Sequence, residues 1–198
     1  MAERITNEQE LIGGTSLDVF RHVVSTQEDL NSLNICTFNE HYIGGWNKSE
    51  NAYIPLEEIS FDDPFSTIRR DYVSGCKFGF FSESSEPDDD GGYLHFQMLE
   101  FDIPKSEQAV TQITDMVKNN RLFYHHNWLL ETDKSYQLIG PELIGVNEIY
   151  TLMGYLLAEH KGLLSDNAIA AILQNHGTAI RIPGVDFPDL SSKVIKLI

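Results

Sequence analysis

The stretch 93–103, YLHFQMLEFDI, is an apolar run that carries two carboxylates near its end, just before Pro104. Alternating aliphatic and aromatic residues of this kind predict a β-strand. Successive side chains of a strand point to opposite faces, so Glu100 and Asp102 are expected to share one face. The stretch therefore predicts a pair of carboxylates at the end of a strand.

Two interpretations of this pair are open. Acidic residues at the end of a strand commonly just face water. Alternatively, Glu100 and Asp102 hold one or two Mg²⁺ or Mn²⁺ ions, which prefer oxygen ligands and keep waters for substrate phosphates. The predicted face also carries Leu94, Phe96 and Met98, so the carboxylates continue an apolar surface. Carboxylates without partners are costly to bury, and a metal ion would relieve that cost.

Length and composition predict a single domain, 1–198, with an N-terminal helix and strands over 1–77 and a core over 78–198. The 41% of hydrophobic residues is enough for a substantial core. No apolar run approaches the length of about 20 residues that crosses a bilayer, and MAERITNEQE lacks the pattern of a signal peptide. A soluble, cytoplasmic protein is expected. Cys36 and Cys76 form no CxxC motif and are expected to be free thiols.

The charge balance is acidic, with 14 Lys and Arg against 30 Asp and Glu and a net charge of −16. Proteins that grip many phosphates across their surface do so with Lys and Arg and are normally basic. The charge balance therefore counts against general affinity for DNA. Any role with nucleic acid must rest on a local site, on bound metal or on a basic partner.

Periodicity and turn signals divide the rest of the chain into interspersed helices and strands. An exposed loop over 82–92 contains a run of aspartates that is interpreted as solvated rather than calcium-binding, and a polar turn is expected around Asn47–Asn51. Predicted helices cover about 15–33, 106–120, 147–160 and 165–177; predicted strands cover 34–46, 51–61, 76–82, 93–103, 128–132, 135–140, 178–184 and 193–198. Thr15 or Ser16 and Ser106 are expected helix caps, and 147–160 is apolar on most sides and predicted to be deeply buried. This pattern indicates an α+β fold with a mainly antiparallel sheet and packed helices.

Two further stretches offer groups that could meet a phosphate. In WLLETDKSYQLIG, Lys134 and Ser135 lie at the bend of a predicted hairpin, where they either contact a phosphate or are ordinary turn residues. In TAIRIPG, Arg181 lies within a predicted strand. Its guanidinium can fork onto a phosphate, or it can form a structural ion pair with Glu100 or Asp102.

The histidines suggest no catalytic set. His125 and His126 are adjacent, and adjacent residues of a strand face opposite ways, so they are a poor chelating pair. His95 shares no face with Glu100. Packing and hydrogen bonding are expected of all three. The chain has no GxGxxG, Walker, HExxH or GxSxG motif.

Taken in order, three stretches resemble the motifs of the archaeo-eukaryotic primase superfamily, in particular its primase–polymerase branch. LEFDIP is similar to its first motif, a strand that ends in two acidic residues two apart, often followed by proline. ETDKSYQLIG occupies the place of its second motif, a Ser-x-His on a hairpin. RIPGVDFPDLSSK resembles a late strand written R-[LI]-P-G-x-x-N-x-K, with Arg181, Pro183, Gly184 and Lys193. The resemblance spans Phe78 to Ile198.

The resemblance implies a catalytic core related to the RNA-recognition-motif fold, with metal-dependent nucleotidyl transfer as its activity. In that chemistry the cations stabilise the attacking and leaving oxygens while the protein positions the reactants. By carry-over, Glu100 and Asp102 are the catalytic residues and the ligands of Mg²⁺ or Mn²⁺. The expected nucleotide-binding residues are Lys134, Ser135, Gln137 and Arg181.

The chain departs from the family pattern at several positions. Gln137 stands where the family has a nucleotide-contacting histidine, and Gln donates a hydrogen bond but carries no charge. Glu100 replaces the first aspartate. Asp166 and Asp186 are guesses for a third carboxylate, and the family asparagine has no clear counterpart in GVDFPDLSS.

Three functions follow as hypotheses. The first is a divergent primase–polymerase-like domain that binds nucleotide or nucleic acid at a local site, with or without residual metal-dependent nucleotidyl transfer. The second is a non-catalytic acidic accessory protein that keeps the fold and meets a basic protein partner. The third is a metal-dependent phosphoesterase that reuses the carboxylate pair. The sequence specifies no oligomeric state.

Overall fold

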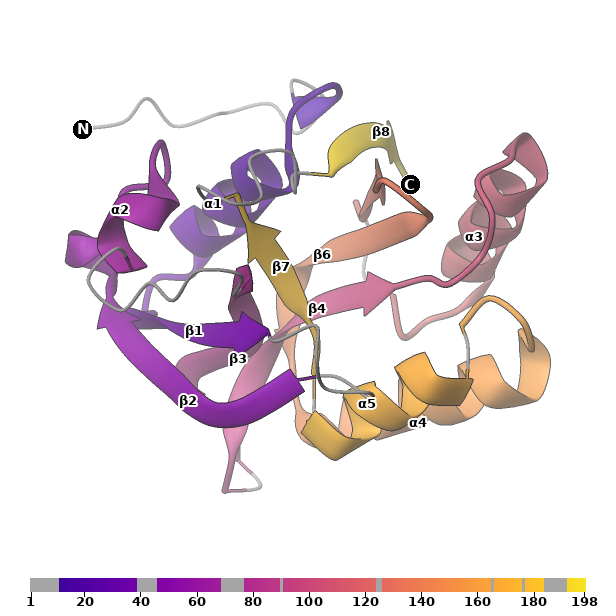
Figure 1. The fold of residues 1–198 in the computed structure, drawn as a ribbon. Helices are drawn as coiled ribbons and strands as arrows, with labels where there is room; N and C mark the ends of the chain where they lie inside the picture. Colours follow the sequence, from indigo (N-terminus) through magenta and orange to yellow (C-terminus); the bar gives the residue numbers. More distant parts are fainter. Residues whose placement is uncertain are drawn as a thin grey trace.

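The structure is a computed structural model that describes residues 11–38, 46–68, 77–89, 91–123, 126–164, 166–175, 177–183 and 192–198. Its elements are arranged as in Figure 1. The strands are β1 Ser32–Phe38, β2 Trp46–Pro55, β3 Lys77–Pro87, β4 Tyr93–Glu100, β5 Trp128–Glu131, β6 Tyr136–Ile144, β7 Ala179–Ile182 and β8 Lys193–Leu197. The helices are α1 Ser16–Thr26, α2 Pro64–Ile68, α3 Glu107–Asn119, α4 Val146–Glu159 and α5 Asp166–Asn175, and a 3₁₀ turn, Leu56–Glu58, follows β2.

The strands form one 8-stranded sheet in the order β2-β1-β3-β4-β6-β5-β8, with β7 paired to β3 off this path. The seven pairings between these strands are antiparallel. The predicted α+β class with a mainly antiparallel sheet is therefore confirmed. Strands from 1–77 and from 78–198 share the sheet, because β1 pairs directly with β3.

The sheet forks at β3. The first half of β3 pairs with β7, from Phe78 opposite Ile182 to Phe81 opposite Ala179, whereas its second half pairs with β4. In Figure 1, β7 runs through the middle of the view, with β1 and β3 on one side and β4 and β6 on the other. The ends of β4 and β7 face each other across this fork, which positions the candidate site.

Two apolar cores cover the opposite faces of the sheet. Alternation along β5 shows the division, because Trp128 and Leu130 belong to one core and Leu129 to the other. The first core packs α1 against the strands, and its aromatic centre is formed by Phe20, Phe80 and Phe96. The ring centroid of Phe20 lies 5.2 Å from that of Phe80 and 4.9 Å from that of Phe96. The second core packs α3, α4 and α5 on the other face. Figure 1 shows α1 above the strands and the α4–α5 pair below them.

The helix caps that the sequence predicts are present. Thr15 forms a capping box with Asp18, and the Ser106 hydroxyl accepts a hydrogen bond from the Ala109 N–H at 3.1 Å. Burial of α4 on most sides is wrong, because Tyr150 and Leu157 are 39% and 37% exposed. Only one face of α4 meets the second core, so its opposite face remains in solvent.

Two predicted loop positions are also wrong. β3 continues to Pro87, because its second half finds a partner in β4, and the loop shrinks to a tight turn in which Gly91 has φ +90°. β2 already begins at Trp46, which pairs with Phe38, so the predicted turn around Asn47–Asn51 is strand. In both cases pairing with a neighbouring strand overrides the local signal of polar residues.

The cysteine and histidine residues that the structure describes lie mostly in the environments that the sequence predicts. Cys36 is a free, buried thiol, and burial raises its pKa to about 12; Cys76 lies outside the described residues. His95 is buried, with Nδ1 3.2 Å from the Ser82 hydroxyl. His126 precedes β5 at φ +73°, so it is not in strand conformation, and His125 lies outside the described residues.

Across the described residues, no helix combines the length and the apolar character needed to span a lipid bilayer.

Candidate functional site

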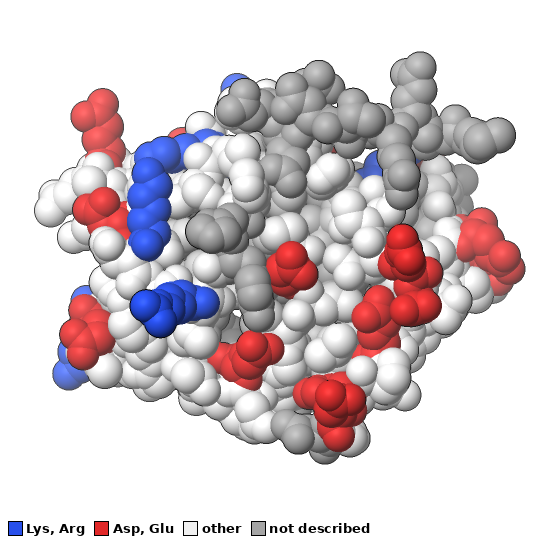
Figure 2. All heavy atoms as spheres, turned by 180° about the vertical axis from the view of Figure 1, so that it is seen from behind, with Lys and Arg blue, Asp and Glu red and all other residues white. Residues whose placement is uncertain are grey.

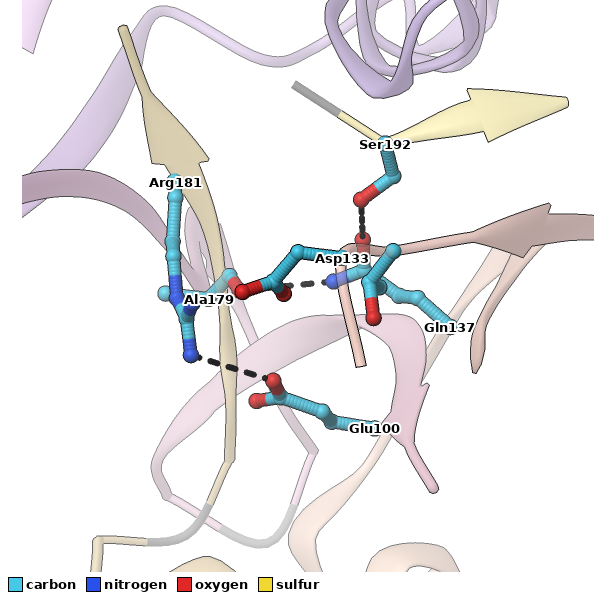
Figure 3. Close-up of a pocket in the computed structure, with 7 residues that line it drawn as sticks. Glu100, Asp133, Gln137, Ala179, Arg181 and Ser192 are labelled. Carbon is cyan, nitrogen blue, oxygen red and sulfur yellow. Dashed lines mark hydrogen bonds and ion pairs between the residues drawn. The ribbon is translucent and has the colours of Figure 1, made fainter. Parts of the chain in front are cut away.

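A small cavity of about 60 Å³ lies at the fork of the sheet. It is bordered by the end of β4, the turn between β5 and β6, the start of β6, and β7. Figure 3 shows the side chains of this pocket converging from these elements. The lining residues are Glu100, Thr132, Asp133, Gln137, Ala179, Arg181 and Ser192.

The pocket is spanned by an ion pair between Arg181 and Glu100, whose Nη2 and Oε1 atoms are 3.3 Å apart. Ile180 and Ile182 point into the first core, so Arg181, between them, points to the other side of β7. Each side chain of the pair keeps 37% of its surface exposed. Of the two roles considered for Arg181, the ion pair with Glu100 is therefore present in the structure.

Gln137 closes the floor of the pocket and is 5% exposed. Its Nε2 donates to the Ala179 carbonyl at 3.4 Å, and its Oε1 accepts from the Ser192 hydroxyl at 3.5 Å. These bonds, drawn in Figure 3, tie β6 to β7 and to the start of β8. Both ends of the Gln137 amide therefore take part in hydrogen bonds that hold these strands together.

The electrostatics of the pocket disfavour the ionised Glu100. Burial raises the pKa of its carboxyl above the ordinary value, the Arg181 guanidinium opposes that rise, and the charges of Asp133 and Asp102 add to it. One guanidinium therefore does not compensate fully for desolvation and the neighbouring negative charges. A carboxylate in this state favours a proton or a cation as its partner.

The turn between β5 and β6 contributes residues that sequence reasoning missed. The Thr132 hydroxyl accepts hydrogen bonds from the N–H groups of Ser135 and Lys134 at 2.9 and 3.3 Å, which fixes the turn and places Asp133 at the pocket. A signal for Asp133 was available, because it directly precedes the two turn residues already singled out. Ser192 had no signal, since its position depends on the return of the chain after β7.

The other predicted site residues lie elsewhere. β4 ends at Glu100, so a strand that carries both carboxylates is wrong; Asp102 is exposed beyond it, and its N–H bonds to the Leu163 carbonyl rather than to a neighbouring strand. Ser135 is 8% exposed, and its hydroxyl donates to the Ile103 carbonyl at 2.8 Å and accepts from the Ile103 N–H at 3.0 Å. Lys134 is exposed at the turn and is not among the lining residues.

The structure therefore brings Glu100, Gln137 and Arg181 together, and it leaves Asp102, Ser135 and Lys134 outside the cavity. Of the guesses for a third carboxylate, Asp166 begins α5 and Asp186 lies outside the described residues. Lys193 is exposed at the start of β8.

The pocket fits a divalent cation only in part. Glu100 and Asp133 offer two carboxylates, and Mg²⁺ commonly takes one or two carboxylates with waters and substrate phosphates as the remaining ligands. Among the described residues, however, no group of three or more His, Cys, Asp or Glu is arranged to hold a metal. When bound, such a cation would neutralise the carboxylates and polarise a phosphate oxygen.

Comparisons of the chain with protein-family models, with curated proteins and with solved structures give no match.

Proposed function

We propose that this chain is a divergent primase–polymerase-like domain, with a core related to the RNA-recognition-motif fold, that binds a nucleotide or nucleic-acid phosphate at the Glu100–Arg181 pocket with the help of Mg²⁺ or Mn²⁺. The observation that supports it is convergence. Glu100, Gln137 and Arg181 come from three stretches far apart in the chain, and they line one cavity. The resemblance to the family requires such a meeting.

The chemistry of binding follows from the ion pair. In the structure the Arg181 guanidinium is paired with the Glu100 carboxylate. A divalent cation held by Glu100, with Asp133 and Asp102 as the nearby carboxylates, would neutralise the Glu100 carboxylate in place of Arg181. Arg181 would then be free to fork onto a phosphate, the geometry that guanidinium groups favour.

The size of the cavity limits the ligand. About 60 Å³ accommodates a few waters or a phosphate-sized group, whereas pockets that enclose whole small molecules measure about 300–1,000 Å³. In this proposal the phosphate enters the cavity and the nucleoside remains outside it. Binding rather than efficient nucleotidyl transfer is proposed, because Asp102 is not in the cavity and Gln137 is already committed to Ala179 and Ser192.

Thermal unfolding tests the proposal. Nucleoside triphosphates with Mn²⁺ are expected to raise the melting temperature of the wild type, and a free ligand concentration of 100 times Kd contributes about 2.7 kcal/mol. Glu100→Gln and Arg181→Met should each lose this shift. Asp115→Asn, an equal loss of charge at an exposed position on α3, should keep it. Equal shifts in the wild type and Glu100→Gln would overturn the proposal.

A second candidate is the non-catalytic acidic accessory protein. It is favoured by the Arg181–Glu100 ion pair, in which the guanidinium already has a carboxylate partner, and by the net charge of −16. In Figure 2 acidic side chains lie across the centre and the right of the face shown, whereas the basic side chains lie mainly at the left, beside a few acidic ones. If this candidate is correct, Glu100→Gln and the wild type show the same change in melting temperature on addition of nucleotide and Mn²⁺. The phosphoesterase alternative predicts Mn²⁺-dependent hydrolysis of bis(p-nitrophenyl) phosphate, which Glu100→Gln should abolish.

A further inference from the structure

A second cluster of functional groups lies on a different part of the sheet, across the adjacent strands β2, β1, β3 and β4. Leu33, Ile35 and Ile54 point into the first core. Asn34 and Tyr53, which alternate with them and pair with each other, therefore point to the opposite face. Glu83 of β3 and Tyr93 of β4 complete the cluster there.

The cluster combines two exposed aromatic rings with a carboxylate. Tyr53 and Tyr93 are 42% and 46% exposed, and their ring centroids are 6.0 Å apart at an interplanar angle of 51°. The Tyr53 hydroxyl donates to the Glu83 Oε1 at 2.6 Å, and the Asn34 Nδ2 donates to the same oxygen at 3.1 Å. Glu83 is half-buried, so its carboxylate is held in place beside the rings.

Asn34 is the buried support of the cluster. It is fully buried, at 0% exposure, and its Oδ1 has no hydrogen-bond partner among the described residues. A buried acceptor without a donor is destabilising. The same amide donates to Glu83, so Asn34 helps to hold this carboxylate in place at some cost in stability.

The charges around the cluster select the sign of the ligand. Burial, together with the hydrogen bond and charge of Glu83, raises the pKa of Tyr53, so its hydroxyl stays protonated and its ring neutral. The Glu83 carboxylate therefore gives the cluster its charge, which is negative. A phosphate would be repelled, and a cation would be attracted.

We infer that Tyr53, Tyr93 and Glu83 form a binding site for a cationic side chain, Arg or Lys, of a basic protein partner. Aromatic faces attract guanidinium and ammonium groups, and an adjacent carboxylate supplies the opposite charge. The site shares no residue with the Glu100–Arg181 pocket and does not rest on the function proposed for that pocket.

Binding of a fluorescent oligo-arginine peptide, measured by anisotropy at physiological salt, tests this inference. Tyr93→Ala and Glu83→Gln should each weaken binding about three- to thirty-fold. Tyr93→Phe, which keeps the ring, and Asp115→Asn, an equal loss of charge on α3, should each stay within about two-fold. Far-ultraviolet circular dichroism confirms that each variant is folded.

Two results would overturn the inference. If Asp115→Asn weakens binding as much as Glu83→Gln does, the peptide senses general charge and not this cluster. If oligothymidine binds the wild type and Tyr93→Ala loses that binding, the tyrosines are a stacking surface for bases.

Discussion

Replacing Ser135 by alanine distinguishes a ligand contact from a structural one. The resemblance to primases places Ser135 at the nucleotide, whereas in the structure its hydroxyl bridges the N–H and the carbonyl of Ile103 at 3.0 and 2.8 Å. These bonds anchor the segment that follows β4 onto the β5–β6 turn. Ser135→Ala is therefore expected to destabilise the protein whether or not a nucleotide is present.

The size of the effect follows from the groups left behind. In the alanine variant the N–H and the carbonyl of Ile103 both lose their hydrogen-bond partner. Ser135 is only 8% exposed, and each such hydrogen bond contributes about 0.5–1.5 kcal/mol net. The loss in unfolding free energy should be about 1–3 kcal/mol. For a chain of this length, 1 kcal/mol corresponds to about 2–4 °C in melting temperature.

Urea denaturation followed by fluorescence of the buried Trp128 measures this difference. The slope with denaturant should stay unchanged, because the surface exposed on unfolding is the same. Lys134→Ala, one residue away and exposed, should remain within about 0.5 kcal/mol of the wild type. The reasoning is refuted if Ser135→Ala is as stable as the wild type and loses only a response to nucleotide.

Two further predictions concern Glu100 and the fork of the sheet. Because burial and neighbouring carboxylates raise the pKa of Glu100 above its unfolded value, the folded state binds more protons and wild-type stability falls as pH rises through the raised pKa. Glu100→Gln should therefore be more stable than the wild type at neutral pH, by up to about 1 kcal/mol for this partly exposed charge. The melting temperatures of the two proteins should become equal below the pKa that Glu100 has in the unfolded chain. A stability difference that does not change with pH would contradict this. A Cβ added at Gly177 would overlap the Ser82 hydroxyl and lie 3.1 Å from His95 Nδ1, so Gly177→Ala should cost about 1–3 kcal/mol in urea denaturation. The control Gly154→Ala, in α4 with no atom within 4 Å of the added methyl, should gain about 0.5–1 kcal/mol, and equal effects at both positions would refute the overlap at the fork.

The elements that sequence reasoning located are those with strong local signals. Ser106 caps α3 as predicted, because a cap depends on residues within one helical turn. The β5–β6 hairpin was found for the same reason. β2 and the second half of β3 were assigned wrongly, because their polar residues enter the sheet through partners that a local pattern does not contain.

The candidate site shows the same division. Glu100 and Arg181 were singled out because a charge among apolar neighbours stands out in a sequence. Their pairing was left open, and Asp102 was placed on the strand that ends before it. Asp133 and Ser192 were missed, since each reaches the pocket through a turn or a return of the chain.

The amino-acid sequence by itself determined the secondary-structure class and the candidate charges, because periodicity, caps and charge balance act over a few residues. Only the tertiary structure decided which of those charges meet. The fork of β3 between β7 and β4 brings Arg181 to Glu100 across 81 positions of the chain, and it leaves Asp102 in solvent. Strand pairing depends on the burial of whole faces of the sheet by residues far apart in the chain, and the position of each single residue depends on that pairing.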